Sequence, residues 1–218
     1  MIPPEDIEAL DEAFATVRTF ALAVHQAPSA SPWFRDLLAS LLDAAPGGYR
    51  LLKLGLRHST SLLAWACRNL LESNIYTQYA LLSRENARRF ALNRTADGID
   101  TCDAFQSWLA RNDPSLVPPE VGRALEQLTA LRALQDEPPP RLYSLKFLSA
   151  EVGLADEYAS MTRVCAKLAE PGIFLLTAAE GDLEPFHPAL FRAGAGHGME
   201  IYQAVKDHFA VFGAEPRP

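Results

Sequence analysis

Two charged side chains stand within the most apolar stretch of the chain, between Leu62 and Leu82. Arg68 and Glu72 are four residues apart, so they share one face of a helix and can form an ion pair. A helix that is apolar on nearly every side belongs in the middle of a bundle, where an unpaired charge is costly. We therefore expect both side chains to be mostly buried and hydrogen-bonded, either as a structural pair or around a ligand.

Polar and aromatic neighbours extend this candidate binding site along the same helix. Asn69 follows Arg68 directly, and Tyr76 lies four residues beyond Glu72. An ion pair that fixes the helix register among aromatic rings explains the pattern, and so does a small-molecule pocket. A cavity that reaches Arg68 or Tyr76 would favour the pocket.

A second group of cations follows the apolar stretch, and its members include Arg84 and Arg88. These two side chains lie on one helical face, and guanidinium groups suit bidentate contacts with phosphate or carboxylate. A solvated face whose arginines pair with acidic residues of the same fold explains the cluster equally well. Arg84 and Arg88 are therefore binding candidates.

Arg192 and His197 flank a glycine-rich segment near the end of the chain. A cation beside an imidazole could bind and cleave a phosphodiester, so this is the alternative ribonuclease pair. No nucleotide-binding loop motif surrounds the glycines, and a flexible approach to a last helix explains them more simply. An acidic surface loop is expected just before it, at 180–187.

The sequence contains no motif for other catalytic or metal chemistry. Cys67, Cys102 and Cys165 are far apart, and no group of His and Cys has zinc-ligand spacing, so we predict no metal and no cofactor. No nucleophile elbow occurs, and apolar surroundings should raise the pKa of the Cys67 and Cys165 thiols. These features favour a protein without catalytic activity.

Apolar residues recur every three or four positions along most of the chain, which predicts helices and almost no strands. The expected fold is all-α, a bundle of seven to nine helices with the apolar helix around Leu62–Leu82 in its centre. Pro46-Gly47-Gly48 should end the second helix. The expected helices span 5–27, 31–45, 49–83 (or two helices that meet at 58–61), 84–94, 100–111, 119–134, 144–150, 155–169 and 198–212, with an apolar turn or helix at 173–179.

Length and charge limit the class of protein. The 218 residues suit one domain, with a sub-lobe junction at the proline-rich segment 136–140 as an alternative. A net charge of −7 opposes nucleic acid as the main partner, without excluding a local basic patch. Polar residues inside the apolar stretch oppose membrane insertion, and the missing signal peptide and unpaired cysteines indicate the cytoplasm.

Two short segments resemble a known group of proteins. The segment Arg68 to Glu72 (RNLLE), followed far downstream by Cys165 to Pro171 (CAKLAEP), is similar to uncharacterised all-helical bacterial proteins related to the HEPN domains. The resemblance implies a helical bundle that often pairs with a second copy. It also implies a bacterial stress or phage-defence setting.

The ribonuclease members of the wider HEPN class carry an Arg, often followed by Asn, and then a His. Arg68-Asn69 matches the beginning of that pattern, but Ser73, Asn74 and Ile75 occupy the histidine window. Glu170 stands where a second histidine would be expected. We therefore expect a non-catalytic helical module that binds a partner protein or a small ligand, with a metal-independent ribonuclease and a small-molecule pocket protein as alternatives.

Overall fold

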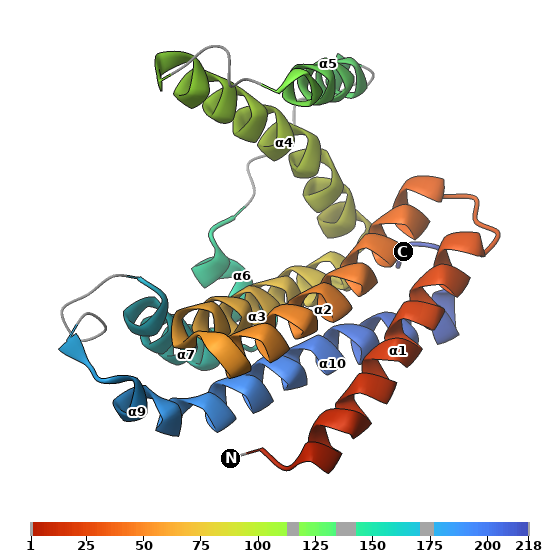
Figure 1. Cartoon of the computed structure of the whole chain (residues 1–218). Helices are drawn as coiled ribbons and strands as arrows, with labels where there is room; N and C mark the ends of the chain where they lie inside the picture. The colour runs from red at the N-terminus through yellow and green to blue at the C-terminus, as the bar shows by residue number, and fades with distance from the viewer. Residues whose placement is uncertain (1, 113–117, 134–142, 171–176, 218) are drawn as a thin grey trace. The chain divides into compact units, whose positions relative to one another are not determined.

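The computed structural model describes residues 2–112, 118–133, 143–170 and 177–217, and all regular structure within these ranges is helical (Figure 1). Eight helices are seven residues or longer, which confirms the expected all-α bundle. They are followed in size by a short α9 and a 3-10 turn. The bounds are α1 (Pro4–Gln26), α2 (Pro32–His58), α3 (Thr60–Leu82), α4 (Arg84–Asn112), α5 (Pro119–Ala133), α6 (Leu145–Glu151), α7 (Ala155–Ala169), α9 (Glu180–Leu183), η2 (Glu184–Phe186) and α10 (His187–Phe212).

The chain divides into two compact units. The first unit contains Met1–Arg84 and Tyr143–Pro218, and the second contains Glu85–Leu142. Two compact units can still fold as one domain, so the single-domain expectation stays a prediction. The proline-rich segment 136–140, named above as a sub-lobe junction, lies outside the described residues.

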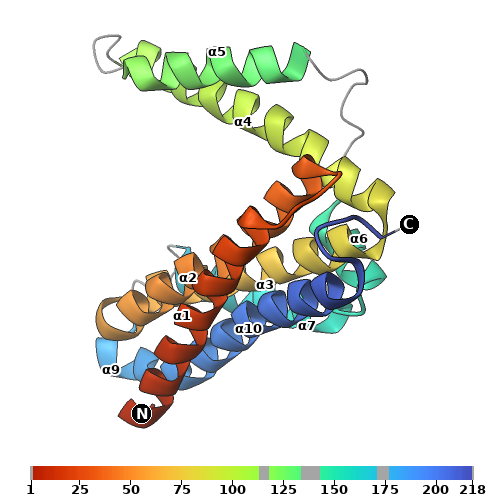
Figure 2. The ribbon, with the colours of Figure 1, turned by 90° about the vertical axis from the view of Figure 1, so that its right-hand side faces the viewer.

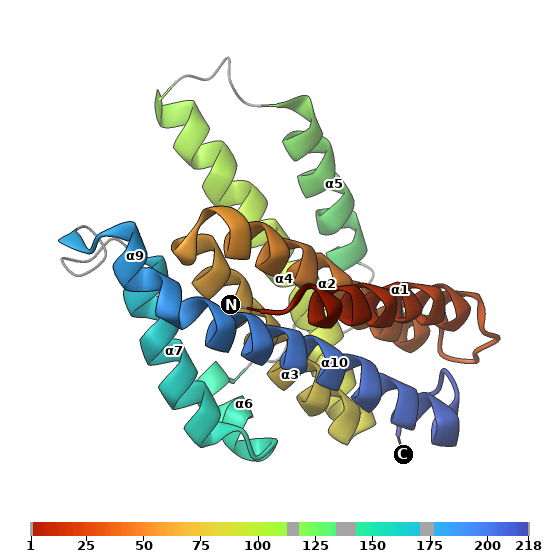
Figure 3. The same cartoon turned by 60° about the horizontal axis from the view of Figure 1, so that its bottom comes forward.

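Helix α3 is the centre of the first unit. It contacts α2, α6, α7 and α10, while α1 packs mainly on α2 (Figures 1 and 2). Helices α6 and α7 lie on the side of α3 that faces away from α1 (Figure 3). The apolar helix expected around Leu62–Leu82 is therefore the central helix. None of the described helices is both long enough and apolar enough to cross a membrane.

The core of the first unit is formed by large side chains from α2, α3 and α10. The fully buried ones include Phe34, Leu38, Leu52, Leu71 and Phe191. Burial of each such side chain contributes roughly 1.5–3 kcal/mol. The spacing of apolar residues in the sequence places them on the inner faces of their helices, which is why the unit holds together around α3.

Helix α2 continues through Pro46-Gly47-Gly48, so the expected break at this point is wrong. Pro46 lacks an N–H group and weakens one turn, but it is itself buried and lies between the buried residues Leu42 and Tyr49. Packing on both sides outweighs the local cost. The chain breaks instead at Ser59, as the two-helix alternative predicted.

The glycine-rich segment is part of α10, so the expected flexible approach to a shorter last helix is also wrong. A Cβ atom at Gly194 would lie 2.8 Å from Leu52 Cδ1, and one at Gly198 would lie 2.8 Å from the Phe14 ring. The glycines therefore let α10 approach its neighbours closely, and burial offsets their low helix propensity.

The second unit is built from α4 and α5, and α4 is one helix where the sequence predicted two. Gly98 faces Leu128 and Gly122 faces Gln106, so the two helices run antiparallel. Leu109 is buried as expected, but Phe105 and Trp108, also expected to point inward, are exposed. Two helices can cover only a narrow stripe of each other, which leaves these rings outside it.

The acidic segment expected as a loop at 180–187 is helical, since it forms α9, η2 and the first residue of α10. The side chain of Asp182 accepts the Ala179 N–H and so supports the first turn. Most of the apolar element expected at 173–179 lies outside the described residues. The helical reading of this segment matters because it fixes where α10 begins.

Candidate functional site

The sharp turn between α2 and α3 consists of one residue, Ser59. Its extended backbone ends α2, and its side-chain oxygen accepts the Leu62 N–H and caps α3. The turn places Thr60 at the first position of α3. A hydroxyl residue that can cap a helix is thus what fixes the direction of Thr60.

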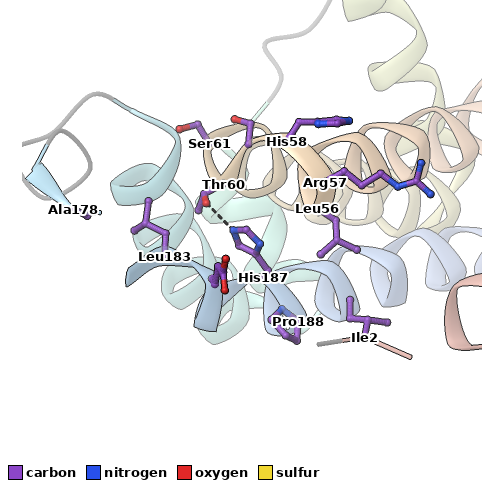
Figure 4. A pocket seen from close by; sticks show the side chains of 12 residues that line it. Ile2, Leu56, Arg57, His58, Thr60, Ser61, Ala178, Leu183, His187 and Pro188 are labelled. Carbon is purple, nitrogen blue, oxygen red and sulfur yellow. Dashed lines mark hydrogen bonds between the residues drawn. The ribbon is translucent and has the colours of Figure 1, made fainter. Parts of the chain in front are cut away.

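The first residues of α3 and α10 meet in the first unit. Thr60 Oγ1 and His187 Nε2 are 2.7 Å apart and share a hydrogen bond, although the residues are far apart in sequence (Figure 4). His187 is the first residue of α10 and is followed by Pro188, which is favourable in a first turn. Both side chains are half-buried. Two helix starts therefore hold a hydroxyl against an imidazole.

This pair stands in the wall of a cavity of about 650 Å³ (Figure 4). One part of the wall is apolar and contains Ile2, Leu56, Leu183 and Pro188. The remaining described lining is mostly polar: Arg57, His58, Ser59, Thr60, Ser61, Ala178, Glu184 and His187. An apolar surface beside a few hydrogen-bonding groups is the usual composition of a small-molecule site.

A smaller cavity of about 260 Å³ lies between α2 and α3. It brings together three of the residues predicted from the sequence, Asn69, Glu72 and Tyr76. Arg68 is not among the residues that line it. The expected cavity therefore reaches Tyr76, but it is smaller than the one at Thr60 and His187.

Arg68 and Glu72 form the expected ion pair, with 2.8 Å between Arg68 Nε and Glu72 Oε1. The expectation that both are mostly buried is only half met, because the side chains keep 34% and 19% of their exposure. Arg68 turns toward the end of α7, where Glu170 lies 3.9 Å away. The hydrogen bond to Glu72 raises the pKa of Arg68. Water reaches this pair, so it stabilises the fold less than a buried pair would.

Replacing Arg68 with alanine should lower the free energy of unfolding by about 1 kcal/mol, as for other partly exposed ion pairs. Chemical denaturation of the variant, with the exposed Arg163→Ala as the charge-matched control, would measure the difference. A loss of about 3 kcal/mol or more would show that Glu72 is left stranded as a buried charge.

Arg84 and Arg88 are both exposed residues of α4. The Arg84 N–H donates to the Arg217 carbonyl oxygen at 3.1 Å, which fixes the backbone where α4 begins. Nearby, Arg89 lies 3.8 Å from Glu85. Neither Arg84 nor Arg88 lines the two cavities described above. Their predicted binding role stays a prediction.

Arg192 and His197, the alternative ribonuclease pair, are not brought together. Arg192 is exposed and lies 3.7 Å from Asp6, whereas the His197 side chain keeps only 3% of its exposure. The two positions are five residues apart on α10 and so face different directions. They form no shared site for a phosphodiester.

His197 lies in a polar cluster between α3, α7 and α10. Its Nε2 is 3.3 Å from Glu157 Oε1, and its Nδ1 is 3.3 Å from Glu200 Oε2. The buried Asn74 donates to the same Glu200 oxygen. These contacts lower the pKa of Glu200, mainly through the hydrogen bond with His197 and against the effect of burial. The cluster connects the three helices that pack around the middle of α3.

The lowered pKa of Glu200 predicts a dependence of stability on pH. Because the fold favours the carboxylate, the stabilisation is present above the usual pKa of 4.5 and is lost as the pH falls through the lowered folded value. Glu200→Gln should therefore show a weaker loss of stability in acid than the wild type. Denaturation at several acidic pH values, with the exposed Glu8→Gln as control, tests this. Equal acid dependence in all three proteins would contradict it.

Among the residues that the structure describes, no three His, Cys, Asp or Glu side chains are grouped so that they could hold a metal ion. The sequence-based expectation of no metal and no cofactor concerned ligands of this kind. It stays a prediction. Thioether sulfur is a further ligand type, considered below.

The sequence did not single out Thr60 and His187 as partners. His58-Ser59-Thr60-Ser61 was recognised only as a bend, and His187 only as the end of an acidic segment. Each stands at a helix start, where a capping serine or a proline gives a local signal. Neither signal indicates that the two helix starts meet.

We also compared the chain with known proteins. It matches no protein-family model, no curated protein and no solved structure. What can be said about its function therefore rests on the residues and the geometry above.

Proposed function

We propose that the protein is a non-catalytic helical module that binds a small molecule in the cavity between the starts of α3 and α10. The observation that carries the proposal is the Thr60–His187 hydrogen bond in the wall of a cavity of about 650 Å³. Ligand pockets in proteins usually have volumes of roughly 300–1,000 Å³. This cavity has a suitable size, and its wall carries polar groups at a defined place.

The composition of the wall indicates the kind of ligand. Ile2, Leu56, Leu183 and Pro188 can cover an apolar body. The hydroxyl and the imidazole beside them can each exchange a hydrogen bond with an oxygen atom. The ligand is therefore an apolar molecule with an oxygen-bearing head, such as a hydroxyl or carboxylate group.

Other features of the cavity favour a neutral or negative head over a positive one. Arg57 and His58 belong to the lining, and Glu184 is its one carboxylate among the described residues. Arg57 also acts on Asp11 of α1, where it helps to lower the pKa of that carboxyl, so its charge is shared. Hydrogen bonding at Thr60 and His187 is thus the main source of head-group selectivity.

Binding of a partner protein stays a prediction, because exposed apolar side chains alone do not identify what covers them. The ribonuclease alternative also stays a prediction, and the separation of Arg192 from His197 gives it no support. The cavity is the feature of the described residues that favours one function over the others.

The first test uses aliphatic alcohols and carboxylates of increasing chain length as probes, with amines of the same length for comparison. Alcohols and carboxylates should raise the melting temperature of the full chain, and longer chains should do so more strongly because they bury more apolar surface. Stabilisation by amines alone would move the head-group site to Glu184 and contradict the role of Thr60 and His187.

A matched pair of variants then locates the head group. Thr60→Val keeps the shape of the side chain and removes the hydroxyl, so affinity for the best probe should fall about fivefold, which corresponds to about 1 kcal/mol for one hydrogen bond. Thr19→Val, on an exposed position of α1, should leave affinity unchanged. Equal affinity of both variants for the probe would contradict the proposal.

A further inference from the structure

A cluster of three sulfur atoms lies between α3 and α7, away from the cavity lining. Cys67 Sγ is 3.8 Å from Met161 Sδ, and the thiols of Cys67 and Cys165 interact with one another. Met161 and Cys165 are four residues apart on α7, so both point toward Cys67 from one helical face. Three sulfur ligands of two kinds thus converge on one point.

We propose that Cys67, Met161 and Cys165 form a three-coordinate site for a soft monovalent ion, Cu(I) or its analogue Ag(I). Thiolate and thioether ligands select such ions over hard cations. A trigonal ion with metal–sulfur bonds of about 2.3 Å separates its ligands by about 4.0 Å. The 3.8 Å between Cys67 and Met161 is close to this separation. Little rearrangement is needed for the ion to bind.

The surroundings favour a soft ion and exclude water from it. Cys67 and Cys165 are fully buried, and Met161, which is half-buried, lies on the route from solvent. A buried site without oxygen or nitrogen ligands is unsuitable for Mg²⁺ or Ca²⁺, which require oxygen. The flexible, polarisable thioether can move aside to admit the ion and then complete its coordination.

The charges balance when both cysteines bind as thiolates. The ion displaces two thiol protons to solvent, no electron is transferred, and the loaded site has a net charge of −1. Arg68 lies next to Cys165 and supplies a positive charge. The Cys67 hydrogen bond and this guanidinium lower the pKa of Cys165, contrary to the rise expected from burial alone. Cys67, whose thiol donates to Cys165 and is buried, has a raised pKa and loses its proton only on binding.

The spacing argument from the sequence missed this site for two reasons. It looked for His and Cys ligands close together on one element, whereas these ligands come from α3 and α7. It also left out methionine, which most often fills gaps in a core.

The test is an anaerobic competition between the reduced full chain and bicinchoninate for Cu(I). Wild type should retain one equivalent of the ion. Cys165→Ser should weaken binding by more than about 100-fold, because loss of an outer-shell group alone costs roughly 10–100-fold. Cys102→Ser is the matched control, since Cys102 is a free cysteine of the second unit, and it should bind like the wild type.

Met161→Leu keeps the core volume and should also weaken binding, so it tests the site if Cys165→Ser fails to fold, as judged by circular dichroism. The proposal is overturned if the folded wild type retains no Cu(I) against the competitor. It is equally overturned if Cys102→Ser loses the ion, or if Met161→Leu and a folded Cys165→Ser hold it as tightly as the wild type.

Discussion

Replacing Gly55 with alanine should lower the free energy of unfolding by about 3 kcal/mol or more, at the upper end of what overpacking a core costs. A Cβ atom at Gly55 would lie 2.4 Å from the backbone nitrogen of Leu63 and 2.6 Å from its Cα. Backbone atoms cannot rotate away as a side chain can. Helices α2 and α3 would have to separate next to the Ser59 turn, so the variant should also bind the cavity probes more weakly.

Gly47→Ala is the control for this prediction. Gly47 belongs to the same helix, but a Cβ atom there would have no neighbour within 4 Å. Alanine is the better helix former by about 1 kcal/mol, so this variant should be unchanged or slightly more stable. Urea denaturation of both variants measures the effect. A Gly55→Ala protein as stable as Gly47→Ala would mean that α2 and α3 do not approach as closely as described.

Leu71→Ala should lower the free energy of unfolding by about 2–5 kcal/mol, the cost of a cavity left by a large core side chain. Leu71 is fully buried in α3, the helix that contacts α2, α6, α7 and α10. Its neighbours belong to several helices, so no single one can move in to fill the space. Thermal and chemical denaturation would both report the loss.

Leu22→Ala on α1 removes the same atoms from a side chain that is 62% exposed. It should change stability by no more than about 0.5 kcal/mol, as surface substitutions usually do. A Leu71→Ala protein that unfolds like Leu22→Ala would show that α3 is not the centre of the core.

The sequence predicted the fold class and several helix bounds well, because apolar spacing reports directly on which face of a helix is buried. The helix expected at 155–169 matches α7, and the one expected at 119–134 matches α5 to within one residue. Both helices lie between strong stop signals. Local chemistry and tertiary packing agree there, so the sequence is sufficient.

The errors fall where packing overrides a local signal. Pro46 does not break α2, and the glycines before His197 do not delay α10, because burial against neighbouring helices outweighs propensities of about 1–3 kcal/mol per residue. Sequence patterns report on one element at a time. They cannot show that Gly194 is needed for close approach to Leu52.

The candidate site was predicted only in part, for the same reason. Arg68 and Glu72 were paired correctly because they are neighbours on one helix. Thr60 and His187 are 127 residues apart, and only the tertiary fold makes them neighbours. The cavity could therefore not be predicted from spacing, although the helix starts that form its wall carry recognisable caps.

Mapping the bound probe by methyl NMR tests the proposed ligand site most directly. The full chain, labelled at Ile and Leu methyl groups, is titrated with the alcohol or carboxylate that stabilises it most. We expect the largest shifts at Ile2, Leu56 and Leu183, which line the cavity, and none at Leu109 of the second unit. Largest shifts at Leu51 and Leu70 of the smaller cavity, or no shift at a concentration that raises the melting temperature, would contradict the proposal.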